Sequence, residues 1–95
     1  MNYRTVDLPV DLADARRHIA ERVDGLVVEE ASGSVEFRTP SGLRLATLSP
    51  VTLSDGERGT RLEYRTAIVS SSAAHARRKA AEIRAAIDNL QRKVP

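Results

Sequence analysis

The chain contains no cysteine and no tryptophan, and its aromatic side chains are limited to Tyr3, Phe37 and Tyr64. The absence of thiols excludes disulfides, thiolate zinc sites, iron–sulfur clusters and a cysteine nucleophile. No stretch of the chain approaches the ~20 apolar residues of a membrane-spanning helix. The first ten residues hold one arginine and no apolar run, so we expect no signal peptide, no membrane partner and a cytoplasmic location.

The residues that are present are typical of one small globular domain. The chain has 95 residues, of which 41% are hydrophobic and 29% are charged. A chain of this size buries about two-thirds of its surface on folding, which suffices for one modest core. Fifteen basic against thirteen acidic residues give a net charge of +2, and this balance does not indicate a nucleic-acid partner. We therefore treat residues 1–95 as a single domain.

The N-terminal third predicts a strand followed by a helix. Residues 2–8 alternate weakly between polar and apolar and end at Pro9, which is typical of a short edge strand. A helix over about 11–24 is indicated by an apolar stripe, with Asp11 as its N-cap and Gly25 just beyond its C-terminal end. The members of this stripe are Leu12, Ala15, Ile19 and Val23.

Four strand-like runs follow, and no helical segment separates them. They cover residues 26–31, 34–39, 43–53 and 60–69. Turn signals rich in serine, glycine and proline lie between them, and the second and fourth runs alternate most cleanly. This pattern predicts an antiparallel meander with one buried and one solvated face. Pro50, inside the third run, predicts a bulge, an edge position or a break.

The C-terminal segment predicts a long second helix. The serines at 70–72 are N-cap candidates, and residues 73–93 are rich in strong helix formers. An apolar stripe runs along this helix through Ala76, Ala80, Ile83, Ile87, Leu90 and Val94. It could form a coiled-coil seam between chains, but its small first members and the need to cover the sheet favour packing within the chain. The fold class is α+β, in the order β-α-β-β-β-β-α: a curved antiparallel sheet with a long C-terminal helix packed on one face.

The opening strand with VDLADARRHIAERVDG, and the strand GTRLEYRTAIV that leads directly into the last helix, resemble a known arrangement. It is the helix grip of the Bet v 1/START-like superfamily, also called the SRPBCC or polyketide-cyclase-like group, in which a curved antiparallel sheet wraps a long C-terminal helix. The resemblance implies a slot for an apolar or amphipathic small molecule between helix and sheet. The same element order also resembles the TATA-binding-protein-like fold, so it does not assign a function by itself.

Residues that could carry catalysis or bind a metal are few. His18 and His75 each lie among arginines, and neither is followed four residues later by a histidine or a carboxylate, so we expect no metal and no cofactor. Glu29 and Glu30 are adjacent in a strand and therefore point to opposite faces, which excludes a paired acid and base. The serines at 70–72 have no G-x-S-x-G surroundings and no nearby base. We expect no catalytic residues.

A nucleic-acid site has little support. The densest basic patch is Arg77, Arg78 and Lys79 with Arg84. At about 100° per residue these side chains spread around the helix instead of forming one stripe. The aromatic platform that single-stranded nucleic acids need is also missing, so we expect only weak, salt-sensitive binding.

Two functional interpretations remain, ahead of nucleic-acid binding. The first is a non-catalytic module that binds an apolar or amphipathic small molecule. Its slot would be lined by Val35, Phe37, Leu45, Leu62, Tyr64, Ile83 and Ile87. The second is a protein-interaction or assembly domain, in which these same side chains are consumed by packing at native density.

For the assembly domain we predict a homodimer. It would form through one of three surfaces: the 2–8 strand, the Pro50 strand treated as a second edge, or the last helix. On that helix the alanines at 81, 85 and 86 would allow a second helix to approach closely.

Overall fold

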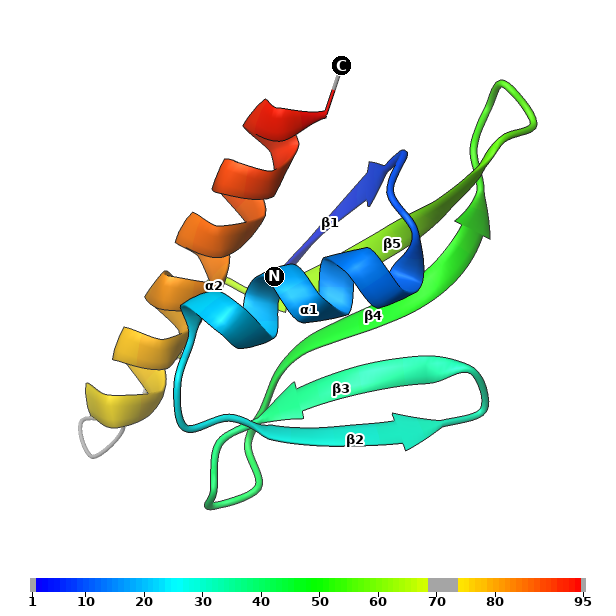
Figure 1. Ribbon diagram of the computed structural model, residues 1–95. Coiled ribbons are helices and arrows are strands. Elements are labelled where there is room, and N and C mark those ends of the chain that lie inside the picture. Colours follow the sequence, from blue (N-terminus) through cyan, green and yellow to red (C-terminus); the bar gives the residue numbers. More distant parts are fainter. Residues whose placement is uncertain (1, 69–73, 95) are drawn as a thin grey trace.

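The computed structural model describes residues 2–68 and 74–94, and places them in five strands and two helices (Figure 1). The strands are β1 (Tyr3–Leu8), β2 (Val27–Ala31), β3 (Ser34–Arg38), β4 (Arg44–Thr52) and β5 (Arg58–Arg65). The helices are α1 (Leu12–Arg22) and α2 (Ala74–Lys93). The predicted element order is confirmed, and the predicted serine caps at 70–72 lie outside the described residues.

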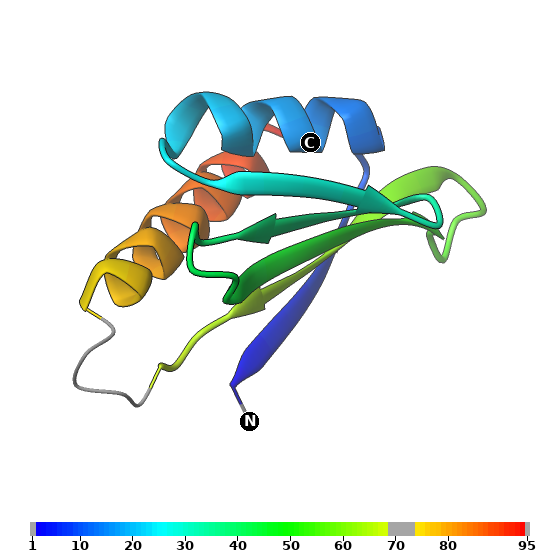
Figure 2. The same ribbon diagram turned by 90° about the horizontal axis from the view of Figure 1, so that it is seen from below.

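The strands form one curved antiparallel sheet in the order β1-β5-β4-β3-β2. Both helices pack on the same face of this sheet and against each other, which leaves the opposite face open (Figure 2). The predicted α+β class, with a long C-terminal helix on one face, is therefore confirmed. Within the described residues, no helix is both long and apolar enough to cross a membrane.

Local sequence signals explain where these elements begin and end. Asp11 precedes α1 as predicted, although its side chain makes no capping hydrogen bond. Ser32 and Gly33 adopt φ of 53° and 81°, the left-handed pair that a two-residue hairpin between β2 and β3 requires. β5 begins at Arg58 and ends at Arg65, so it starts and stops earlier than the 60–69 run predicts.

The prediction that the Pro50 strand forms a sheet edge is wrong, because β4 lies between β5 and β3. Leu53 donates its N–H to the Glu57 carbonyl at 2.8 Å, which extends the β4–β5 ladder. Alternate residues of an antiparallel strand bond to opposite neighbours, so the backbone nitrogen of Pro50 points away from β5. On that side, the pairing of β4 with β3 extends only as far as Leu48. The N–H that proline lacks would thus point beyond the end of β3, where no ladder needs it.

A bulge in β4 places two consecutive residues in the core. The β3–β4 register shifts between Phe37 and Arg38, so that Arg44 and Leu45 lie opposite one residue of β3. Leu45 and the following Ala46 are both fully buried, whereas Arg44 contacts residues on the open face.

The core lies between the inner face of the sheet and the two helices. Phe37 and Tyr64 are 0% and 7% exposed, and they share one cluster with Ile83 and Ile87 of α2, as predicted. The stripe of α1 contributes Ala15, Ile19 and Val23 to the same cluster. Leu90 is the last buried residue of the α2 stripe. Val94, the last member of the predicted stripe, lies beyond the end of the helix at Lys93 and is only partly buried.

Truncation of Phe37 tests this packing. Phe37→Ala should lower the free energy of unfolding by about 3–5 kcal/mol, because it removes a large side chain from a core that cannot collapse fully. That loss is comparable with the whole stability of many small domains. Urea denaturation followed by circular dichroism measures the loss.

Val27→Ala is the matched control, because Val27 is 39% exposed and should change the stability by less than about 0.5 kcal/mol. Equal stabilities for Phe37→Ala and the wild type would contradict the assignment of the sheet faces.

Candidate functional site

The seven residues predicted to line a ligand slot lie together in the core. Val35 and Tyr64 are 4% and 7% exposed, and the other five are 0% exposed. These five are Phe37, Leu45, Leu62, Ile83 and Ile87. Of the seven, only Val35 lines any of five surface clefts found among the described residues. All seven side chains belong to one buried cluster.

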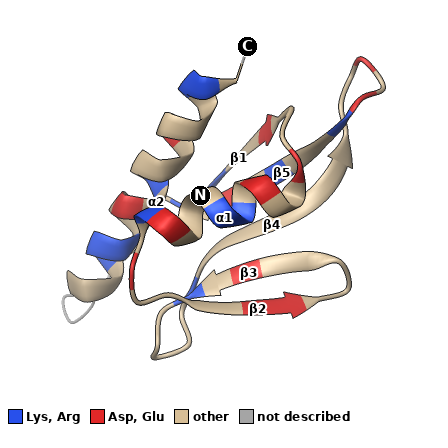
Figure 3. Cartoon of the chain, in the orientation of Figure 1, with Lys and Arg blue, Asp and Glu red and all other residues tan. Residues whose placement is uncertain are grey.

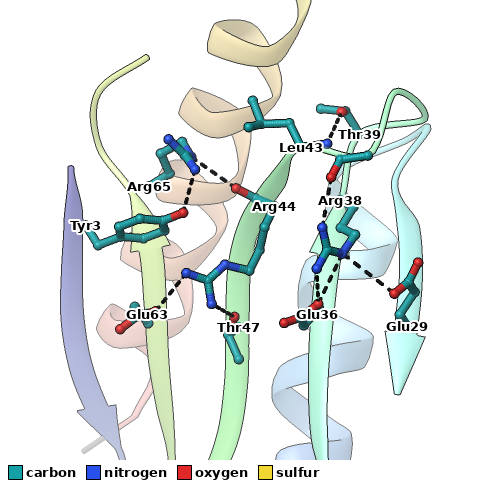
Figure 4. Close-up of polar contacts among 11 residues, drawn as sticks. Tyr3, Glu29, Glu36, Arg38, Thr39, Leu43, Arg44, Thr47, Glu63 and Arg65 are labelled. Carbon is teal, nitrogen blue, oxygen red and sulfur yellow. Dashed lines mark hydrogen bonds and ion pairs between the residues drawn. The ribbon is translucent and has the colours of Figure 1, made fainter. Parts of the chain in front are cut away.

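The open face of the sheet carries a ladder of paired charges (Figure 4). Arg38 of β3 contacts Glu36 at 2.6 Å and Glu29 of β2 at 3.6 Å. Arg44 of β4 contacts Glu63 of β5 at 3.6 Å. Opposite charges on neighbouring strands are a favourable cross-strand arrangement and keep this face hydrated. The ladder accounts for the polar half of the alternating pattern.

Tyr3 of β1 stands between two arginines at one end of this ladder (Figure 4). The guanidinium carbons of Arg44 and Arg65 lie 4.9 and 4.8 Å from its ring centroid, a distance typical of cation–π contacts. Arg65 donates to the Tyr3 hydroxyl at 2.5 Å and to the Arg44 carbonyl at 3.0 Å. The Tyr3 hydroxyl also raises the pKa of Arg44. The sequence pattern does not indicate this cluster, because the cluster depends on the register between strands.

β1 is a terminal strand with outward-pointing backbone groups. Thr66 donates its N–H to the Asn2 carbonyl at 2.7 Å, which adds one pair to the β1–β5 ladder. Since bonding alternates along an antiparallel strand, the even-numbered residues of β1 face β5. Tyr3, Thr5 and Asp7 therefore direct their N–H and C=O groups away from the sheet. No described strand lies beyond them.

Asp7 is anchored at the far end of this edge. Arg61 of β5 donates to both of its carboxylate oxygens, at 2.9 and 3.1 Å. The hydrogen bond from Arg61 lowers the pKa of Asp7. Asp7 thus stays ionised and fixed on the open face, and β1 is held in register with β5.

The other terminal strand, β2, is acidic. As predicted, Glu29 and Glu30 point to opposite faces: Glu29 contacts Arg38 on the open face, and Glu30 pairs with Arg16 of α1 on the helix side. The acidic residues of β2 and of its neighbour β3 lie together at this edge of the sheet (Figure 3). The two edges therefore differ in charge.

His18 lies, partly buried, at the contact between the two helices. Its Nε2 atom lies 3.1 Å from the Ala86 carbonyl of α2 and accepts a hydrogen bond from Arg22 at 2.9 Å. Burial, together with the positive charge of Arg22, lowers the pKa of His18. His75 is exposed on α2.

Comparisons with known proteins supply no assignment: no protein-family model, no curated protein and no solved structure matches the chain. Within residues 2–68 and 74–94, no group of three or more histidine or acidic side chains is placed to hold a metal ion.

The lowered pKa of His18 predicts a pH-dependent stability. As the pH falls, the unfolded chain takes up the proton before the folded chain does. The contribution of His18 to the free energy of unfolding is complete above about pH 6.5, and it decreases as the pH falls toward the lower pKa of His18 in the folded chain. His18→Gln should flatten the stability profile between about pH 5 and 7.

His75→Gln, which leaves His18 in place, is the control and should keep the wild-type slope. Thermal denaturation across this range measures both, and equal slopes for wild type and His18→Gln would contradict the prediction.

Proposed function

We propose that this domain is a non-catalytic assembly module that pairs with a second copy of itself along β1. The observation that carries the proposal is the terminal position of β1 together with the outward backbone groups of Tyr3, Thr5 and Asp7. Exposed strand edges are ready templates for further pairing, and small domains gain stability by covering them.

The β1 edge is complementary to itself. In an antiparallel pair centred on Thr5, each Thr5 lies opposite the Thr5 of the second copy, and Tyr3 lies opposite Asp7. All three residues have outward backbone groups, so this register supplies about six hydrogen bonds between the chains. On the helix side the same register places Arg4 opposite Val6. No like charges face each other, which satisfies the requirement of a two-fold interface.

The β2 edge fits self-pairing less well. The register that overlaps all of Val27–Ala31 places the two copies of Glu29 opposite each other on the open face. Like charges directly opposite are destabilising in a sheet. The charge pattern therefore favours β1 over β2 as the site of association.

The packing of the core also favours assembly over a small-molecule slot. The seven candidate lining residues bury one another, and helix-grip proteins need free volume at this position to hold a ligand. The helix-grip relationship itself remains a proposal, supported by a curved sheet beneath a long C-terminal helix. Weak nucleic-acid binding is the least supported function, because the arginines of the open face are engaged by carboxylates and by Tyr3.

Sedimentation equilibrium at tens of micromolar tests the proposal. We expect the wild type to approach twice the monomer mass of 10.4 kDa. Thr5→Pro should remain monomeric, because it removes an N–H that β5 does not use and therefore spares the internal ladder. Thr5→Lys retains the backbone groups but places like charges opposite each other, and should weaken the dimer as well.

Glu30→Pro is the matched control on the other edge. Ala31 and Ser34 flank a two-residue hairpin and form its hydrogen-bonded pair, so the neighbouring Glu30 directs its backbone N–H and C=O away from β3. The substitution should leave the dimer intact. A wild type that sediments as a monomer would overturn the proposal. A dimer abolished by Glu30→Pro and retained by Thr5→Pro would overturn it too, and would assign the interface to β2. Circular dichroism of each variant separates loss of pairing from loss of folding.

A further inference from the structure

A surface cleft of about 490 Å³ lies between the start of α1 and the outer part of the β4–β5 hairpin. One wall consists of Asp11 and Leu12, at the start of the helix. The other consists of Arg58 and Gly59 of β5 and of residues 50–52 of β4. This part of the hairpin extends beyond the end of β3 (Figure 1). The volume is that of a pocket for a small organic molecule.

Asp11 lines this cleft with a carboxylate that the described chain does not use. An aspartate just before the first helical residue usually accepts a hydrogen bond from the backbone of the first turn. Here that capping bond is absent, and within the described residues Asp11 forms no ion pair. Asp14, the acidic residue of the first turn, pairs with Arg17. The Asp11 carboxylate is therefore available to a cationic group in the cleft.

Arg58 supplies the opposite charge from the other wall. Alternation along β5 places its side chain on the same face as the buried Thr60 and Leu62, which is the helix side of the sheet. By the same alternation the preceding Glu57 is directed to the opposite face. Among the residues that the structure describes, the Arg58 side chain has no carboxylate partner. Its guanidinium group is therefore available to an anionic group.

The register of the sheet sets the spacing of these two charges. Thr60 donates its hydroxyl to the Val10 carbonyl at 2.8 Å, which fixes the residue before Asp11 at the level of Thr60. Arg58 lies two residues away along β5, a distance of about 7 Å. An extended dipeptide spans about 7 Å between its ammonium and carboxylate ends. The two free charges are thus spaced to receive the two ends of such a molecule.

The main chain of β4 adds neutral hydrogen-bonding groups to the cleft. Residues 50–52 are consecutive and all line it. Because alternate side chains of a strand point to opposite faces, the backbone of this segment borders the cleft as well. Leu53 bonds to Glu57 of β5, so the N–H and C=O of Thr52 point away from β5, to the side on which β3 has already ended. An amide group can pair with them, and a single amino acid has no such group.

We propose that this cleft binds a dipeptide in an extended conformation through its two charged ends. Asp11 binds the ammonium group, and Arg58 binds the carboxylate through paired, charge-assisted hydrogen bonds. The amide between them pairs with the backbone of Thr52, as a short added strand would. Leu12 and Pro50 provide apolar contact for the side chains. The site is separate from the proposed β1 pairing, so either proposal can fail without the other.

Titration of the ¹⁵N-labelled domain with dialanine tests the site by NMR. We expect saturable amide shifts centred on residues 11–12, 51–52 and 58–59. Alanine carries its two charges too close together to reach both Asp11 and Arg58, and N-acetyl-dialanine amide carries neither charge. Both should therefore bind about tenfold more weakly than dialanine, or worse, as loss of a charge-assisted hydrogen bond implies.

Matched variants assign the two ends of the ligand. Arg58→Gln should weaken dialanine binding about tenfold or more, and should not change the binding of dialanine amide, which has no carboxylate. Asp11→Asn should weaken dialanine binding in the same way, and should not change the binding of N-acetyl-dialanine, which has no ammonium group. Arg78→Gln and Asp24→Asn remove the same charges from exposed positions outside the cleft, and should change the affinity less than about twofold.

Four results would overturn the inference. Three of them are the absence of saturable shifts at millimolar dialanine, shifts centred on another surface, and equal affinities for dialanine and N-acetyl-dialanine amide. The fourth is equal weakening by Arg58→Gln and Arg78→Gln, which would indicate general attraction of charge and no built site. Circular dichroism confirms that each variant is folded, and the blocked ligands give a readout on the wild type that does not depend on any variant.

Discussion

The packing of both helices against one face of the sheet is the constraint on which the rest of the structure depends. A five-stranded open sheet must cover one apolar face, and this chain has a single phenylalanine and no tryptophan with which to fill the space. Phe37 is therefore central, and the aliphatic stripes of α1 and α2 close around it. Because so few large side chains are available, reaching native packing density uses all of them. That shortage supports the proposal of a filled core over that of a ligand chamber.

Because both helices lie on one face of the sheet, the opposite face is exposed to solvent. That face carries the polar residues of the alternating pattern, many of them in ion pairs. Exposed ion pairs such as Arg44–Glu63 contribute little to stability, about 0–1 kcal/mol each. Their main effect is to place charges of opposite sign next to one another, which makes the open face polar. At one edge of the sheet the outward backbone groups of β1 are not paired with any described strand.

The parts of the fold that depend on local pattern could be predicted from the sequence, and the parts that depend on register could not. Alternation in 34–39 placed Val35 and Phe37 on the buried face, and helical spacing identified both helices. The interior position of Pro50 was missed, because strand order depends on pairing between distant segments. The contact between Tyr3 and Arg65, 62 residues apart, was missed for the same reason. The seven candidate lining residues do cluster, but whether such residues enclose a ligand or fill a core depends on volumes that a pattern of polarity does not encode.

Tyr3 belongs both to the outer edge of β1 and to the open face of the sheet. Its backbone N–H and C=O groups point outward from β1, where the proposed second strand would pair. Its hydroxyl accepts a hydrogen bond from Arg65, and its ring lies close to the guanidinium groups of Arg44 and Arg65. These contacts attach β1 to β5 and β4 through side chains as well as through the backbone ladder. The strand proposed to pair is therefore ordered before it pairs, so less conformational entropy would be lost on association than for a free strand.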